Sequence, residues 1–135
     1  MEIKRNEATI NRPQGDRVID APFVFMDLPA FIRQIKKEKT WKESDRNGIT
    51  VFKSEGITVV LTALRQEAKM SDSTVDGFLF VQVLDGNAEI STAEGEFTIK
   101  KNQAVTFHPG IHYSITASTE AIFLFTTFYH IKDAY

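Results

Sequence analysis

A stretch near the C-terminus reads NQAVTFHPGIHYSIT, residues 102 to 116, and sets two apolar runs on either side of a tight turn. Pro109 and Gly110 supply the turn, since proline presets one backbone angle and glycine adopts conformations that other residues avoid. His108 and His112 flank it, and histidine is a residue type that binds metals and moves protons. The stretch therefore combines a strand–turn–strand pattern with two candidate functional side chains.

Short β-rich runs of this kind fill the chain from about residue 45 onward. Turn residues separate them, as in SEG at 54 to 56 and LDGN at 84 to 87, and no second helical period occurs. The runs predict eight strands, near residues 49–53, 57–66, 78–84, 87–92, 96–100, 104–107, 112–117 and 121–129. Eight short strands at this spacing indicate an all-β sandwich or barrel.

The first 45 residues have a different character. Residues 1–20 are polar and rich in turn signals, which indicates an irregular or edge-strand arm. Asp27 can cap a helix that has Pro29 in its first turn and runs to about Lys39, with one narrow apolar stripe of Phe31, Ile32 and Ile35. We expect a single domain in which residues 1–45 form an arm and one short surface helix, packed on a barrel of residues 46–130.

Two of the predicted strands are apolar on both faces. They read FLFVQVL at 78 to 84 and AIFLFTTFY at 121 to 129, whereas a sheet with one wet face shows alternation. The arm and helix, or a second copy of the chain, must cover the additional apolar face. We favour the second copy and so predict a homodimer.

Composition excludes several classes of function. The 135 residues carry a formal net charge of −2, so no strong electrostatic attraction to nucleic acid or anionic lipid is expected. The absence of cysteine excludes disulfides, thiolate zinc sites and cysteine nucleophiles. No apolar run is long enough for a signal peptide or a membrane span, and no nucleotide, zincin or hydrolase motif occurs. The expectation is a cytoplasmic protein without nucleic-acid or membrane partners.

Residues 57 to 128 resemble the cupin family, whose double-stranded β-helix carries two sequence motifs. The end of the first, G-x5-H-x-H-x3-4-E-x6-G, is similar to FLFVQVLDG with Gly86 as the closing glycine. The second, G-x5-P-x-G-x2-H-x3-N, is similar to NQAVTFHPGIHYSIT. Fifteen residues, 87 to 101, separate the two, which is typical of small bacterial cupins. The resemblance implies a jelly-roll barrel, the RmlC-like fold.

The departures from the motifs concern the residues that hold a metal in cupins. The glutamate of the first motif falls on Leu79, and its two histidines fall on Asp72 and Thr74. In the second motif Asn102 replaces the first glycine, His108 the proline and Thr116 the final asparagine. His112 comes one residue before the motif's histidine, and a one-residue deletion in the loop would bring it to that ligand's place.

A transition metal in such a barrel needs three or four nitrogen or carboxylate donors, and a single imidazole binds weakly. His130 lies beyond the last predicted strand, so only His112 has a claim from the motif, with His108 on the adjoining turn. Further oxygen ligands are available from Asp72, Asp76, Glu67 and Gln82, although none stands at the glutamate position. We therefore expect no metal and no other cofactor.

The candidate ligand-binding residues are His112, His108, Asp72, Thr74 and Leu79. Leu79 makes the barrel floor apolar, which favours a small organic ligand over an ion. The structural alternatives are a hydrogen-bonded His112 at the barrel mouth, a His108 that faces solvent, and turn roles for Asp72 and Thr74.

The main hypothesis is a cupin without the usual metal site, which binds a small molecule in its barrel or nothing. An atypical metal-dependent oxygenase or isomerase built on His112 is one alternative. The others are a metal-free isomerase with His112 and Asp72, and a structural or regulatory module with a filled barrel. The sequence leaves open whether the chain is an enzyme and identifies no catalytic residue.

Overall fold

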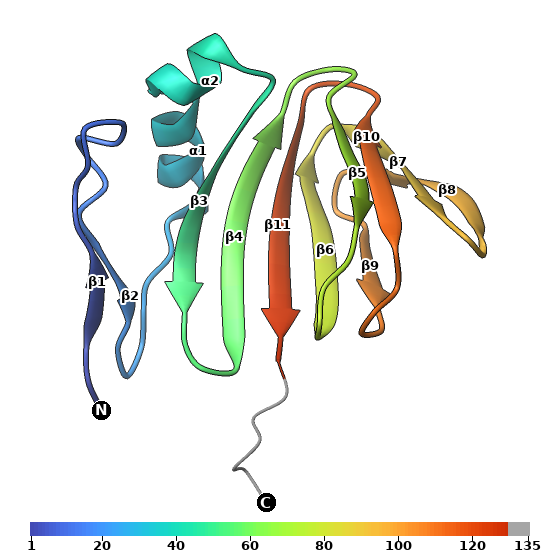
Figure 1. Cartoon of the computed structure of the whole chain (residues 1–135). Helices are drawn as coiled ribbons and strands as arrows, with labels where there is room; N and C mark the ends of the chain where they lie inside the picture. The colour runs from blue at the N-terminus through green and yellow to red at the C-terminus, as the bar shows by residue number, and fades with distance from the viewer. Residues whose placement is uncertain (130–135) are drawn as a thin grey trace, which may run out of the picture.

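A computed structural model of the chain describes residues 1–129 (Figure 1). The chain folds into two antiparallel sheets that face each other, with two helices and a small hairpin on one side. His130, the last residue of the predicted barrel, lies outside the described residues. Within residues 1–129, no helix is both long and apolar enough to cross a bilayer.

The first sheet has five strands in the order β3, β4, β11, β6 and β9. Their bounds are Arg46–Lys53, Ile57–Leu64, Ala121–Phe128, Phe78–Asp85 and Ala104–Phe107. The second sheet has four strands in the order β5, β10, β7 and β8, with bounds Lys69–Ser73, Tyr113–Ala117, Asn87–Thr92 and Gly95–Lys100. The eight predicted strands are all present, and the predicted all-β jelly roll is confirmed.

Three strands and one helix were not predicted. The polar segment of β5 was interpreted as a loop, but its backbone pairs with β10. The arm contains a hairpin of β1 (Lys4–Asn6) and β2 (Arg17–Asp20). Strand β5 and the β1–β2 hairpin both form by pairing with segments distant in sequence, and the local spacing of apolar residues does not predict such pairing.

The predicted helix is present and ends at Lys37, two residues before the predicted end at about Lys39. Helix α1 spans Leu28–Lys37, and the Asp27 side chain caps it as predicted, since Oδ1 accepts a hydrogen bond of 3.1 Å from the amide of Ala30. Glu38 then leaves the helical region (φ −75°, ψ 152°), and a second short helix, α2, spans Lys39–Glu43. The break turns the Glu38 carboxylate toward the arm and lets α2 bury Trp41.

Two apolar cores lie on opposite faces of the five-stranded sheet. The core between the two sheets includes Leu79, Val81, Ile115 and Phe123, each at most 3% exposed. The other core lies between the sheet and the helices, and Ile35 of α1 is fully buried in it. The helices therefore cover the second apolar face of β11 within one chain, so that strand does not require a second copy. Dimer formation stays a prediction.

The arm is held against β3, the edge strand of the large sheet. Arg12 donates three hydrogen bonds of 3.0–3.1 Å to the Glu38 carboxylate and one of 2.6 Å to the Gly48 carbonyl. Arg17 donates from Nε to the Thr50 carbonyl at 2.8 Å. Two carbonyls of an exposed edge are thus satisfied by guanidinium groups, which blocks pairing with another strand.

Burial raises the pKa of the Glu38 carboxyl, but the hydrogen bonds from Arg12 and Asn47 outweigh that effect. The net pKa of Glu38 lies below its ordinary value, so the carboxylate form is favoured in the folded chain.

Two turn positions that align with motif glycines have left-handed backbone. Gly86 has φ +80°, and a Cβ there would lie 2.3 Å from the Glu120 carbonyl oxygen. Asn102, which replaces a motif glycine, has φ +69°, a conformation that asparagine tolerates better than most residues. The motif alignment therefore holds at both turns for a steric reason.

Candidate functional site

The interior positions at which the cupin resemblance implies metal ligands carry apolar and aromatic side chains. Leu79, at the glutamate position, is 3% exposed and pairs across the sheet with Phe107 of β9. The Phe107 ring stacks on Tyr113, with ring centroids 5.0 Å apart and an interplanar angle of 17°. Side chains thus fill this part of the barrel, and Leu79 belongs to the packed core rather than to an open cavity floor.

Tyr113 is the inward-facing residue that the sequence analysis missed. It is 5% exposed, and residues 113–117 alternate buried and half-buried. Counting the second motif without a gap places its histidine on residue 113, so strict spacing was the available signal. The deletion that would bring His112 to this place does not occur. Burial raises the pKa of the Tyr113 phenol, which the neighbouring Ser73 side chain opposes in part.

His112 lies at the rim of the four-stranded sheet and pairs with Asp72 of β5. Its Nδ1 is 2.9 Å from the Asp72 Oδ1, and the two side chains are 65% and 82% exposed. A carboxylate only accepts, so this contact assigns the proton to Nδ1 and leaves Nε2 free to act as a base or acceptor. A hydrogen bond between two side chains this exposed adds little to stability.

Asp72 has a left-handed backbone conformation, φ +44°, within a strand. Its amide donates a hydrogen bond of 3.0 Å to the Ser114 hydroxyl, which holds the residue in this conformation. With Ser91, Thr92 and His112 these residues line a shallow hollow of about 190 Å³. The sequence analysis named Asp72 and His112 as separate candidates, and the fold brings these two side chains together.

The remaining candidates lie apart from this pair. His108 is exposed after β9, and its ring packs against Phe78 with centroids 5.0 Å apart. Thr74 is exposed just beyond β5, as a loop residue. Ligand binding by any one of the five predicted residues stays a prediction. The five residues do not lie together in one site.

The residues at the ligand positions do not fit the metal ion that the cupin resemblance implies. Leu79 and Tyr113 offer no carboxylate or imidazole inside the barrel, while His112 and Asp72 lie at the rim. Across residues 1–129, no three His, Asp or Glu side chains are grouped to hold a metal ion.

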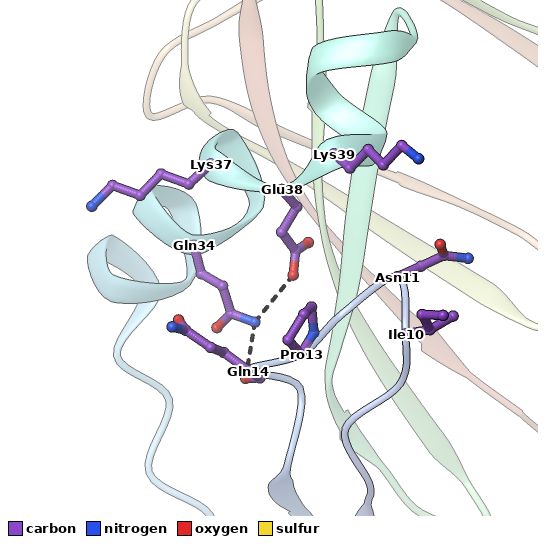
Figure 2. A pocket seen from close by; sticks show the side chains of 8 residues that line it. All are labelled: Ile10, Asn11, Pro13, Gln14, Gln34, Lys37, Glu38 and Lys39. Atoms are coloured by element: carbon purple, nitrogen blue, oxygen red, sulfur yellow. Dashed lines mark hydrogen bonds between the residues drawn. The ribbon is translucent and has the colours of Figure 1, made fainter.

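A larger hollow of about 360 Å³ lies between the arm and the helices (Figure 2). Gln34 of α1 bridges it, since Nε2 donates 3.2 Å to the Gln14 carbonyl and 3.4 Å to the Glu38 carboxylate. Ile10 at its margin is 95% exposed. Its polar contacts hold the arm to α1, and none of the predicted site residues takes part.

Solved structures that resemble this chain include cupins. A cupin superfamily protein from Desulfitobacterium hafniense has TM-score 0.62 and 14% identity, over 65% of this chain and 81% of that one. KdgF from Halomonas sp. has TM-score 0.60 and 10% identity, over 67% and 84%. An RmlC-like cupin from Shewanella frigidimarina has TM-score 0.60 and 10% identity, over 66% and 80%.

No protein-family model matches the sequence, and no curated protein is similar to it at a significant level. The likeness to the solved structures shows that the chain has the cupin fold, as its two motif-like turns predicted. At sequence identities of 10–14% the likeness establishes the fold alone. Any activity must be inferred from the residues of this chain.

Proposed function

We propose that this chain is a metal-independent cupin-fold protein whose barrel is a structural core, and that it acts through its surface. The observation that carries the proposal is the filling of the barrel by Leu79, Phe107 and Tyr113 at and beside the metal-ligand positions. An apolar interior packed in this way gives a metal no donors and leaves a small molecule no room. This favours a binding or structural role over the enzymatic alternatives built on His112. A cytoplasmic location stays a prediction.

Metal content tests this proposal directly. The full chain is purified without chelator, its iron, manganese, nickel and zinc are measured by mass spectrometry, and its Tm is then recorded with and without each added ion. We expect less than about a tenth of an ion per chain and no change in Tm. A specific metal at one hundred times its Kd would stabilise the fold by about 2.7 kcal/mol. Near-stoichiometric metal together with a raised Tm would refute the proposal.

A second candidate function is supported by the His112–Asp72 pair. Strained backbone and an oriented imidazole are features that gather at functional sites, and neither adds much to stability here. The surrounding Ser91, Thr92 and Ser114 hydroxyls suit a neutral polyhydroxy ligand, whereas the Asp72 carboxylate disfavours an anion. We propose that this hollow is a weak site for a neutral sugar or polyol.

Nuclear magnetic resonance of the His112 ring tests the second candidate, with glucose as the probe and acetate as the anionic comparison. We expect saturable shifts with glucose in the millimolar range and none with acetate. His112→Ala should remove glucose-induced shifts at the Ser114 amide, and His108→Ala should keep them, because His108 is exposed but lies outside the hollow. If 50 mM glucose, a concentration high enough to detect a dissociation constant of about 50 mM, causes no chemical-shift change in the His112 ring, this site is rejected.

A further inference from the structure

Two phenylalanines of the segment between β2 and α1 project into solvent. Phe23 is 87% exposed and Phe25 is 86% exposed. Between and after them Val24 and Met26 are half-buried, and Met26 packs on the core under the helices. The segment is therefore anchored by alternate residues while its two largest side chains stay outside. Single exposed apolar residues are common, but two whole rings on one anchored segment form a patch that indicates an interface.

An aromatic hollow lies elsewhere on the same chain, where β6 begins and β11 ends. Its volume is about 280 Å³, and it is lined by Asp76, Gly77, Phe78, Pro109, Phe128 and Tyr129. Phe78, Phe128 and Tyr129 are 43%, 46% and 41% exposed. The hollow is slightly below the range of about 300–1,000 Å³ for small-molecule sites, yet a cavity of about 150 Å³ already admits benzene. At nearly twice that volume, the hollow has room for two phenylalanine rings.

We propose that a second copy of this chain occupies the hollow, and that Phe23 and Phe25 of each protomer insert into the hollow of its partner. One chain carries both the projecting rings and a hollow that fits them. A two-fold axis satisfies both contacts at once, because residue i then meets residue j and residue j meets residue i. The pairing would form a closed dimer and leave no hollow open for further growth.

The area of these aromatics matches what a stable dimer requires. An aromatic side chain buries about 150–250 Å², so the exposed parts of the five rings amount to about 600 Å² in each protomer. Both protomers together would bury about 1,200 Å², which reaches the lower bound of specific interfaces before any surrounding polar contact is counted. Rings of this kind dominate interface energies.

Light scattering coupled to size-exclusion chromatography tests the proposal on the full chain between about 1 and 100 µM, the range in which weak specific dimers form. We expect twice the protomer mass of 15.3 kDa. Phe23→Ser with Phe25→Ser should raise the dissociation constant at least about 100-fold, since the symmetric dimer loses four rings and each contributes more than about 1 kcal/mol at a hot spot. Phe128→Ser should weaken the dimer comparably. Phe97→Ser is the matched control, because Phe97 is 40% exposed on β8 and lies outside the patch and the hollow.

Mixing the two weakened variants tests the mode of contact. The double Phe variant keeps its hollow, and Phe128→Ser keeps its projecting rings, so one intact contact returns in the mixed dimer. We expect the mixture to dimerise at least about tenfold more tightly than either variant alone. A monomeric wild-type chain at 100 µM, a dimer unaffected by loss of Phe23 and Phe25, or a mixture with no recovery would each overturn the proposal. All the substituted rings are at least two-fifths exposed, and circular dichroism checks that every variant is folded.

Discussion

Replacing Leu79 by alanine measures whether the barrel is filled. Leu79 is 3% exposed and lies in the core between the sheets. Losing its branched end removes about 2.4 kcal/mol of transfer free energy, at about 0.8 kcal/mol for each carbon. A residual void adds about 24 cal/mol for each Å³ that does not collapse, so the full loss should be about 3–4 kcal/mol.

Urea denaturation followed by circular dichroism gives the free energy of unfolding for this comparison. In a domain of this size 1 kcal/mol shifts Tm by about 4 °C, so Leu79→Ala should lower Tm by about 12–16 °C. Leu84→Ala is the control on the same strand, because Leu84 is half-buried on the helix side. Its loss should be about half as large. Benzene should partly restore the stability of Leu79→Ala, since an apolar void of this kind stays dry and binds small apolar molecules.

A loss below about 1 kcal/mol for Leu79→Ala would refute the reasoning. It would mean that Leu79 faces an open cavity already filled with water, where removing its end leaves no new void. In that case the prediction of a small organic ligand in the barrel regains support, and the proposal of a structural core fails.

Three further predictions concern turns and titrating groups. Gly86→Ala should lower the free energy of unfolding by about 2 kcal/mol or more, because the new Cβ would meet the Glu120 carbonyl oxygen. Gly110→Ala should lower it by about 1 kcal/mol, because Gly110 has φ +78° but no atom within 4 Å of such a Cβ. Equal losses for the two variants would contradict the steric argument. Glu38→Gln should lose about 2–3 kcal/mol at pH 7 through its buried hydrogen bonds, and its stability should fall less between pH 5 and 3 than that of the wild type. The sign follows from the lowered pKa of Glu38: its contribution is full above the unfolded pKa of about 4.3 and is lost as the pH falls through the folded value, so parallel acid-unfolding curves would count against it. The raised pKa of the Tyr113 phenol affects stability at alkaline pH: its contribution to the free energy of unfolding is present below the unfolded pKa of about 10 and is lost as the pH rises through the folded value. The stability of Tyr113→Phe should therefore fall less steeply with rising pH than that of the wild type. An unchanged alkaline slope would show that burial does not control the ionisation of this phenol.

Local chemistry predicted what depends on neighbours in sequence. The Asp27 cap needs only the amide three residues along, and the eight strands need only runs of apolar and β-branched residues between turn formers. The hairpin of the arm and strand β5 were missed because their partners are distant in sequence. The second short helix was missed because the break at Glu38 depends on Arg12, twenty-six residues earlier.

The candidate site shows the same division. Substitution of the cupin ligands by Leu79, Asp72 and Thr74 was visible in the motif, and it directed attention away from the usual donors. Spacing alone did not choose between His112 and Tyr113 for the inward position. Strand alternation in the folded sheet makes that choice, since adjacent residues face opposite sides.

The sequence by itself determined the jelly-roll class, through turns whose glycine and asparagine residues suit a backbone that other residues resist. Only the tertiary structure decided that Leu79 and Tyr113 pack in the core at the ligand positions, that α1 and α2 cover the second face of β11, and that Asp72 meets His112 at the rim. Each of these depends on the side to which a strand turns its residues and on which distant segment packs there. Such contacts are determined by the packing of the whole chain, and no local pattern of residues carries them.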